Sequence, residues 1–357
     1  PVALVIAETF EQARHGAHLL ELQIAAKTGQ VDPEAAGFET PDDQQDSQGD
    51  LDQAMQDAAA SVDVTYTTPG HNSAAMEPHA SIASWDGAHL TLRGSYQMPN
   101  YNINELASSV GIDAAQVRIL SPFVGGGFGA KLGIAPEAVA AALAAMELSR
   151  PVGVALSRQQ VFETTMRRSE SRQRVRLSAD AQGHLTGIGH EAYVSNLRLA
   201  NFPDKNPTSG LPFSSHKLAE ALTIGAKRFG WDARDPKPAS RKEGEWLIGM
   251  GMASAVRVNI LSEARARVEL SPDGRATVET DMTDIGTGTY AILTQICSEM
   301  LGLPPADVTV SLGDTEHPRG PGSGGSWGAA SAGTAVFLAC EKIRSEIAKK
   351  LDVDESD

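Results

Sequence analysis

Cysteine is scarce in this sequence, and long apolar runs are absent. The two cysteines, Cys297 and Cys340, each lie in an apolar stretch typical of a helix, so two buried thiols are expected. No CxxC pair occurs, which excludes an iron–sulfur cluster or a cysteine-type zinc site held by this chain alone. The nine histidines show no HxH or HExxH spacing, so zinc is not predicted. No apolar run approaches the roughly 20 residues that span a membrane.

Basic and aromatic residues are also few. The chain has 30 Lys and Arg against 45 Asp and Glu, and its formal charge of −15 argues against nucleic acid as a partner, because phosphates require a basic face. Aromatic residues make up only 5% while glycines number 34, which favours tight loops over a thick aromatic core. A chain of 357 residues has room for two or three domains, each with its own core.

The start of the chain does not resemble a secretion signal. Residues 1–7 lack a basic region and lead directly into a helix-like stretch, Glu8–Leu20. They predict a buried strand that begins within a domain. The compartment, periplasm or cytoplasm, stays open. A polar stretch over residues 42–50 is then expected to be a solvated linker.

Three further regions follow along the chain. Residues 60–197 are rich in strand-like sequence around one alanine-rich helix, Pro136–Leu148. Residues 201–245 hold many Pro, Lys and Asp residues around a short amphipathic helix, Ser215–Phe229. Beyond Leu247 the pattern returns to strands, loop and helix.

The chain contains an internal repeat. Residues 82–92 and 268–278 both predict hairpins with an Asp-Gly turn, and each is followed by a loop and a helix. The helices end in similar tails, 110–119 and 301–310, with an apolar residue, a glycine, a short turn and an alternating strand. Chance similarity of two common motifs is the alternative, but the order of elements favours two related lobes.

Three glycine-rich loops each follow a predicted strand and precede a predicted helix. We name them the first loop (Val124–Lys131), the second loop (Asp284–Thr289) and the third loop (Gly320–Gly328), the last before a helix expected over Thr334–Leu351. Helix N-termini and closely approaching glycine backbone favour bound anions. One such loop is weak support, because most glycine clusters are turns. Three together predict a ligand with several anionic groups, such as a dinucleotide or a pterin phosphate.

A nicotinamide enzyme is the main alternative. The first loop fits the dinucleotide fingerprint as Gly125-x-Gly127-x-x-Ala130, and Arg158 after the next strand is suited to a 2′-phosphate. However, no acidic residue closes that strand and no series of βα units follows. An ATP loop is excluded because Lys131 is followed by leucine instead of Ser or Thr.

Other polar groups have simpler explanations. Glu77-Pro78-His79 resembles a metal or acid–base pair, but a structural turn is the simpler interpretation. The arginines between Arg167 and Arg176 lie on a strand whose alternation points half of them to solvent. No serine lies in a nucleophile elbow, which argues against a hydrolase.

Taken together, the motifs resemble the molybdenum-binding (large) subunit of the xanthine oxidase and aldehyde oxidase family. The likeness is nearest to bacterial periplasmic aldehyde oxidoreductases, which carry molybdopterin cytosine dinucleotide. It runs over nearly the whole chain, and its most telling pieces are Ala75–Ala80, Tyr96–Met98, Gly125–Gly129, Thr280–Gly288 and Gly322–Ser326.

The resemblance implies roles for individual residues. Gln97 would hydrogen-bond a ligand oxygen on molybdenum, and no side chain would bind the metal directly. The residues Gly126, Gly127, Phe128 and Gly129 would pass beside the metal. Thr287, between Gly286 and Gly288, would contact the pterin or its phosphate. The pterin–pyrophosphate portion would be held by Gly322, Ser323, Gly324, Gly325, Ser326 and Ser331.

The resemblance also implies a reaction and partners. Members oxidise aldehydes or heterocycles with water as the oxygen source, and electrons leave through 2Fe-2S clusters and FAD. Because this chain has no CxxC, these groups would reside on an iron–sulfur subunit and an FAD subunit. Purine-oxidising members place a glutamate where Leu132 stands, so Phe128 and Leu132 would favour aldehydes, above all aromatic ones.

The predicted fold class is α+β, with two related molybdopterin-binding lobes of mixed sheets and helices, preceded by the end of a small, hammerhead-like α+β domain. The expected domains are 1–55 (end of the small domain and linker), 56–197 (first lobe) and 198–357 (second lobe, incomplete at its end). The family's middle segment is expected to be missing between Asn196 and Leu197.

The glutamate that serves as catalytic base in the family matches no residue here, so catalytic residues stay unassigned. A fragment of a complete enzyme and a catalytically incomplete cofactor-binding protein are both compatible with these departures. A sugar- or peptide-binding module that uses the same loops is an alternative of another class.

Overall fold

A computed structural model describes residues 3–23, 47–193, 218–233, 241–250 and 260–353. The chain divides into two compact units, one made of residues 1–195 and 260–357 and the other of residues 196–259. The larger unit holds the three glycine-rich loops. Among the described residues, no helix is long and apolar enough to cross a membrane.

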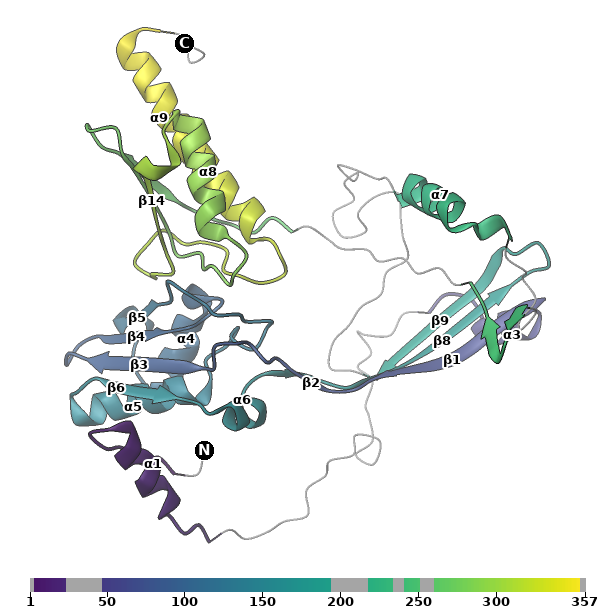
Figure 1. The fold of residues 1–357 in the computed structure, drawn as a ribbon, viewed down its shortest axis with the longest axis horizontal. Coiled ribbons are helices and arrows are strands. Elements are labelled where there is room, and N and C mark those ends of the chain that lie inside the picture. The colour runs from purple at the N-terminus through teal and green to yellow at the C-terminus, as the bar shows by residue number, and fades with distance from the viewer. Residues whose placement is uncertain (1–2, 24–46, 194–217, 234–240, 251–259, 354–357) are drawn as a thin grey trace. The chain divides into compact units, whose positions relative to one another are not determined.

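The first core is built on a four-stranded sheet in the order β5-β4-β3-β6 (Figure 1). Strands β3 (Ala80–Trp85) and β4 (Leu90–Gly94) form the expected antiparallel hairpin, whose turn is held by the Asp86 carboxylate. Strand β5 (Val117–Leu120) pairs with β4 in parallel, while β6 (Val152–Ala155) pairs with β3 in antiparallel fashion.

Two helices cover one face of this sheet. Helix α4 (Pro99–Val110) packs near β5, and α5 (Pro136–Leu148) packs on β3, with the bounds predicted for it from the sequence. Small side chains let α5 approach the sheet closely, because alanines make up its buried face. The residues that fill this core are Ala83, Leu90, Leu92, Tyr96, Leu106, Ile119, Ala138, Ala141, Ala142 and Ala145.

The second core repeats the same order of elements. Its hairpin consists of β12 (Arg267–Leu270) and β13 (Ala276–Thr280), and β14 (Val308–Leu312) pairs with β13 in parallel. Helix α8 (Thr289–Leu301) connects the hairpin to β14 and packs against α9 (Gly328–Leu351) (Figure 1).

The predicted repeat is confirmed down to the helix ends. Helices α4 and α8 both end at a left-handed glycine, Gly111 at φ 78° and Gly302 at φ 67°. Each is followed by a 3₁₀ turn, η2 (Ala114–Gln116) or η4 (Pro305–Asp307), which leads into the parallel strand. The two cysteines are buried in the second core as unpaired thiols, as expected.

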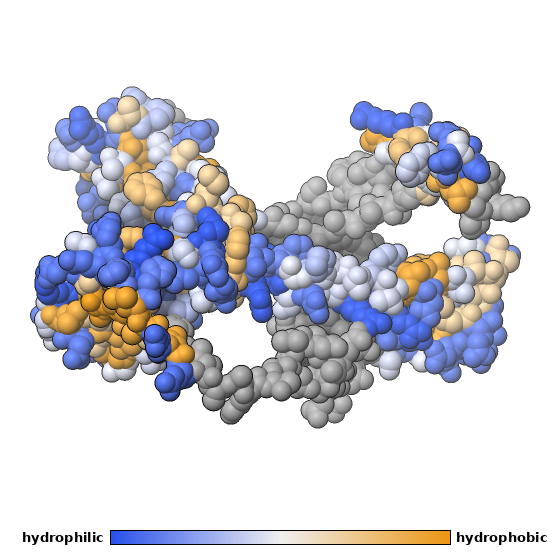
Figure 2. Space-filling view, turned by 60° about the horizontal axis from the view of Figure 1, so that its bottom comes forward, coloured by the Kyte–Doolittle hydropathy of each residue, from blue (hydrophilic) through white to orange (hydrophobic). Residues whose placement is uncertain are grey.

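A separate antiparallel sheet has the order β1-β8-β9, with β1 (Ala60–Thr68), β8 (Ser171–Ala179) and β9 (Leu185–Tyr193). The short helix α3 (Leu51–Gln56) packs on the face that carries Gly187 and Gly189. The opposite face leaves apolar side chains exposed, among them Val62, Tyr66, Leu185 and Ile188. Figure 2 shows a mainly hydrophilic surface broken by separate apolar patches.

The arginines of β8 are not simply solvated. Arg174 pairs with Asp63 at 2.7 Å, and Arg176 pairs with Asp52 at 2.7 Å. A two-stranded ribbon of β2 (His71–Asn72) and β7 (Arg167–Arg168) accompanies this sheet, and α6 (Arg158–Thr164) precedes β7.

Several expected elements differ. Residues 3–7 form no strand, and Leu4 and Ile6 lie exposed; α1 (Phe10–His18) is shorter than expected. Helix α9 begins at Gly328, six residues before the predicted start. The glycines there predicted a loop, but they are needed for packing, because a Cβ at Gly328 would lie 2.2 Å from the Met282 side chain.

The smaller unit contains the predicted amphipathic helix as α7 (Leu218–Phe229) and the 3₁₀ turn η3 (Trp231–Ala233). A short hairpin follows, β10 (Arg241–Glu243) with β11 (Trp246–Ile248). Much of the polar linker at 42–50 and the expected junction at 196–197 lie outside the described residues, and residues 47–49 form no helix or strand.

Candidate cofactor site

Gln97 lies where the first and third loops meet. It is buried at the end of β4, between Tyr96 and the start of α4. Its Oε1 atom accepts hydrogen bonds from the amides of Gly129 (3.1 Å) and Lys131 (3.3 Å), and its Nε2 donates to the carbonyl of Ser323 (2.8 Å). One amide side chain therefore connects both loops.

The Gln97 backbone strengthens this junction. Its N–H donates to the Lys131 carbonyl at 2.8 Å, and its carbonyl accepts from Ser323 N at 2.7 Å and from the Thr283 hydroxyl at 3.0 Å. Thr283 immediately precedes the second loop. All three loops are thus fixed to one residue. A primary amide nitrogen carries two hydrogens, so Gln97 has a donor besides the one bonded to Ser323.

The first loop is packed so tightly that its glycines are required. A Cβ at Gly127 would lie 2.4 Å from Gln97 Oε1, and one at Gly125 would lie 2.5 Å from the Glu77 Cβ. Gly126 and Gly129 have φ angles of 90° and 93°. Phe128 lies between them at φ 53° with 67% of its surface exposed, a conformation that non-glycine residues rarely adopt.

The inner side of the first loop is held by Glu77 and Lys131. Glu77 Oε2 accepts from Lys131 Nζ at 2.7 Å, from Gly125 N at 2.7 Å and from the Ser95 hydroxyl at 2.6 Å. Burial alone would raise the pKa of Glu77, but these bonds outweigh it and keep the pKa below its usual value. The interpretation of residues 77–79 as structural is supported, since Glu77 anchors the loop.

His79 holds the same loop at its other end. Its Nε2 lies 3.0 Å from the carbonyl of Ala130. Burial lowers the pKa of His79, so the ring is neutral near pH 7. A neutral, buried imidazole that binds a backbone carbonyl positions the chain and is not an acid–base group.

The second loop is shaped by one carboxylate. Asp284 Oδ1 accepts from the amides of Gly286 (2.8 Å) and Gly288 (3.2 Å), and Oδ2 accepts from Tyr290 N (3.3 Å). Gly286 and Gly288 both have positive φ angles, and Gly288 caps α8. Thr287 lies exposed between them, beside the N-terminus of that helix.

The third loop precedes the N-terminus of α9. Its Ser323 is buried and donates to the Thr283 carbonyl at 2.7 Å, while Trp327 Nε1 donates to the Pro321 carbonyl at 3.0 Å. Gly322 packs against Met98, and Gly325 and Ser326 lie exposed at positive φ. The loop therefore presents backbone to the surface beside a helix start.

Ser331 lies farther inside. Its hydroxyl donates to the Trp327 carbonyl at 2.8 Å and accepts from Ser262 N at 3.0 Å. Its side chain fixes the first turn of α9, and a direct contact with cofactor stays a prediction.

Leu132 follows the first loop and faces the third. Its Cδ2 lies 3.6 Å from the position of a Cβ at Gly324, and its Cδ1 lies 3.8 Å from that of a Cβ at Gly129. The Asn102 side chain donates to its carbonyl at 2.8 Å. Leu132 is therefore an apolar side chain held between two of the glycine-rich loops.

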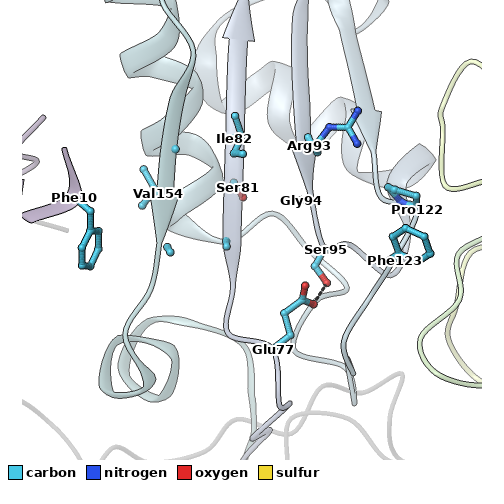
Figure 3. A pocket seen from close by; sticks show the side chains of 13 residues that line it. Phe10, Glu77, Ser81, Ile82, Arg93, Gly94, Ser95, Pro122, Phe123 and Val154 are labelled. Carbon is cyan, nitrogen blue, oxygen red and sulfur yellow. Dashed lines mark hydrogen bonds between the residues drawn. The ribbon is translucent and has the colours of Figure 1, made fainter. Parts of the chain in front are cut away.

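A hollow of about 460 Å³ lies on the open face of the four-stranded sheet (Figure 3). Ile82 lines its apolar floor beside Gly153, and Glu77 with Ser95 closes one end through their hydrogen bond. A second hollow of about 530 Å³ lies between β2 and Phe128, beside Arg168. Phe128 thus faces an open space on the protein surface.

Two residues that form the site are not predicted by the sequence, the buried Lys131 and Asp281. Asp281 lies 1% exposed next to the third loop, where it accepts from Gly320 N, and burial raises its pKa to about 6. Sequence carries little signal for such contacts, since 39 residues separate Asp281 from Gly320.

The residues present suit a phosphate-bearing pterin. The second and third loops place backbone N–H groups at the starts of α8 and α9, helices of 13 and 24 residues. A side chain at Gly127 would be excluded by Gln97, so the first loop offers bare backbone. Among the described residues, no group of three or more His, Cys, Asp or Glu could hold a metal ion.

Comparisons with known proteins agree with this geometry. Two models described as molybdopterin cofactor-binding domains match residues 37–211 and 225–357. The aldehyde oxidoreductase molybdenum-binding subunit PaoC of Escherichia coli (strain K12) is 38% identical over 426 aligned residues, which cover 99% of this chain and 58% of that protein. This chain thus spans less than two thirds of that relative. Because the alignment exceeds 357 positions, PaoC holds residues without a counterpart here.

Solved structures share the fold. Quinoline 2-oxidoreductase from Pseudomonas putida 86 superposes with a TM-score of 0.71 at 18% identity, covering 98% of this chain and 59% of that one. Aldehyde oxidoreductase from Desulfovibrio gigas gives 0.65 at 17% identity, covering 86% and 44%. The two matched cofactor-binding domains, the likeness to PaoC and the shared fold place this chain among the molybdenum-binding subunits of the xanthine oxidase and aldehyde oxidase family.

Proposed function

We propose that this chain forms the cofactor-binding part of a molybdenum hydroxylase that oxidises aldehydes, above all aromatic ones, to carboxylic acids. The convergence of three loops on Gln97 carries the proposal, because it assembles exposed backbone, two helix N-termini and one amide around a common point. The aldehyde oxidoreductase name of PaoC supports the substrate class.

We further propose molybdopterin cytosine dinucleotide as the cofactor. The second and third loops would hold its phosphates, and Gln97 with Gly127–Gly129 would lie beside the metal. When bound, the molybdenum centre supplies two-electron oxidation of an electron-poor carbon, with water as the oxygen source. An iron–sulfur subunit and an FAD subunit would carry the electrons away.

The chain's own residues orient and select the substrate. Phe128 offers an exposed ring on a fixed loop, and Leu132 adds an apolar contact without a hydrogen-bonding group. An aromatic aldehyde packs well in such surroundings, whereas a purine would leave ring nitrogens unpaired at about 1–3 kcal/mol each. No base is assigned among these residues.

The dinucleotide-enzyme alternative fits the structure poorly. A Rossmann unit needs parallel strands on both sides of its helix. Here β6, which follows α5, pairs only with β3, and that pairing is antiparallel. The first loop also folds back onto Gln97, and α5 begins only at Pro136.

The test is elemental and nucleotide analysis of the full-length protein made with its native partners. We expect about one molybdenum per chain and release of CMP on acid hydrolysis, together with turnover of benzaldehyde. Stoichiometric NADP without molybdenum would instead support the alternative of a nicotinamide-dependent enzyme. Bound molybdenum without turnover of any aldehyde would instead indicate a cofactor-binding protein that lacks catalysis.

A further inference from the structure

Lys131 is the largest fully buried side chain among the described residues. Its ammonium group has 0% exposed surface and lies 2.7 Å from Glu77 Oε2 and 2.9 Å from the Ser95 hydroxyl. A buried charge is costly unless it is paired and hydrogen-bonded. Because water does not reach the Lys131 ammonium group, this lysine does not contribute to solubility, and its role lies in its contacts inside the protein.

The position of the pair relative to the first loop indicates that purpose. Glu77 binds the N–H of Gly125 at the start of the loop, and Lys131 is the last residue of the loop. The pair thus connects both ends of the loop across its base. Gln97 binds the loop at Gly129 and at Lys131. Side chains therefore fix the first loop at both ends, while Phe128 in its middle faces outward.

The loop needs such restraint because its own sequence supplies little. Four of the five residues from Gly125 to Gly129 are glycines, which gain most conformational freedom when unrestrained. Phe128 has a left-handed backbone that persists only when its surroundings impose it. Cutting the restraint would let the peptide groups turn away from the orientation that the structure shows.

We propose that Glu77 and Lys131 are positioning residues that fix the backbone of Gly125–Ala130 in the orientation in which this loop receives the cofactor. The second half of this statement rests on the proposed function. The first half concerns the loop alone and holds with or without bound cofactor. Neither residue is placed in contact with the reacting atoms.

The two residues are not equivalent, which gives a sharp test. Lys131 has no access to water, whereas 42% of the Glu77 side chain is exposed. Glu77→Gln therefore leaves a buried ammonium without its counter-charge, while Lys131→Met leaves a carboxylate that water can reach. Glu77→Gln should disturb the loop more than Lys131→Met, and the double variant should recover part of the loss.

The experiment compares these variants in the full-length protein with its partners. Hydrogen–deuterium exchange reports on the peptide covering residues 125–132, and molybdenum per chain is measured after gel filtration. Asp314→Asn is the matched control, because it removes an ion pair of the same 2.7 Å length, with Arg118, away from the first loop. Exchange in α5, residues 136–148, shows whether the first core stays folded.

We expect Glu77→Gln to speed exchange in the loop by about tenfold, since local opening is no longer opposed by the pair. Molybdenum retention should fall several-fold, and the double variant should lie between Glu77→Gln and wild type. If Glu77→Gln does not fold, loop exchange in the double variant Glu77→Gln/Lys131→Met is compared with that in Asp314→Asn and decides the same question. Loop exchange equal to that of the control would overturn the proposal, and faster exchange with full molybdenum retention would overturn its second half, the link to cofactor binding. Wild-type protein without molybdenum would defeat the proposed function, while the exchange measurement would still decide the loop's restraint.

Discussion

The two cores share one order of elements but hold their loops by different means. In the first core the loop is fixed by the Gln97 amide and by an ion pair between the buried Lys131 and Glu77, which also accepts the N–H of Gly125. In the second core the loops are fixed by carboxylates that accept backbone N–H groups, Asp284 in the second loop and Asp281 at the third. A repeated fold thus supports two loop chemistries, one that presents bare backbone beside Phe128 and one that presents helix N-termini.

The sheet faces that no helix covers also differ between the two cores: one is apolar and the other is charged. In the first core Ile82 and Gly153 leave an apolar hollow. In the second core, by contrast, Arg267 and Glu279 form an ion pair across neighbouring strands. Both ion pairs carry one charge of each sign, and they differ in burial: Lys131 is inaccessible to water, whereas Arg267 is exposed. Four measurements test the contrast.

The largest effect should come from the buried pair. Glu77→Gln should lower the free energy of unfolding by about 3–5 kcal/mol, because Lys131 stays buried without a counter-charge. Glu279→Gln should cost only about 0–1 kcal/mol, since its partner Arg267 is 53% exposed. Urea titration of both variants measures the difference. Equal losses would show that the two pairs are not different in kind.

The pH dependence of stability should differ in sign between the Asp281 and Glu77 carboxylates. The pKa of Asp281 is raised by burial from 3.8 to about 6, so its contribution to stability is full below pH 3.8 and is lost as pH rises through 6. Asp281→Asn removes this dependence. The stability of the variant minus that of wild type should therefore rise by on the order of 3 kcal/mol between pH 4 and pH 7.

Glu77 should show the opposite slope, because its pKa is lowered. Its contribution is present above pH 4.5 and is lost as pH falls below that value. Urea titrations at several pH values measure both. If the stability of Asp281→Asn minus that of wild type did not change between pH 4 and pH 7, water would reach the Asp281 carboxylate.

Glycine substitutions should distinguish the first loop from the third. A Cβ at Gly127 would meet Gln97 Oε1 at 2.4 Å, whereas a Cβ at Gly324 would make ordinary contacts at 3.6–3.8 Å. Gly127→Ala should thus cost about 2 kcal/mol and reduce bound molybdenum, by the overpacking that a dense interior resists. Gly324→Ala should retain the stability of the wild-type protein, because its Cβ meets only ordinary contacts. Thermal unfolding and metal analysis decide; similar behaviour of the two would contradict the packing argument.

The smallest effect concerns substrate selection at Leu132. Leu132→Glu places a charge in an apolar position between Gly129 and Gly324. We expect kcat/KM for benzaldehyde to fall about tenfold, or roughly 1.4 kcal/mol, while N-heterocycles gain. Steady-state kinetics of the full-length enzyme provide the measurement, with Leu132→Met as the apolar control. Unchanged aldehyde kinetics would remove Leu132 from the substrate site.

Local patterns predicted much of the fold. Helix Pro136–Leu148 could be predicted at both ends, because proline at the start and alanine throughout act within the segment. The paired hairpins were predictable because an Asp-Gly turn determines its own geometry. The early start of α9 was not, because Gly328 and Gly333 are weak helix formers. Packing requires glycine at both positions, because a Cβ would lie 2.2 Å from the Met282 side chain at Gly328 and 2.9 Å from the Ile296 side chain at Gly333.

The site shows the same division. The three loops were visible as glycine clusters, and Gln97 was identified through a family motif. Its link to Ser323 was not, because that contact joins residues 226 positions apart. The role of Lys131 was hidden for the same reason, since a lysine is normally a surface residue and only its partner Glu77, 54 positions away, explains its burial.

The 226-residue separation between Gln97 and Ser323 also has a consequence for the order of folding. In each core a hairpin joins two strands that follow one another in the chain, and such local contacts form early. The junction at Gln97 closes a far longer stretch of chain, so its loop-closure entropy is larger. We expect it to form after both cores. We therefore expect the three loops to come together last, and a cofactor that binds all three to enter only a chain whose cores have already folded.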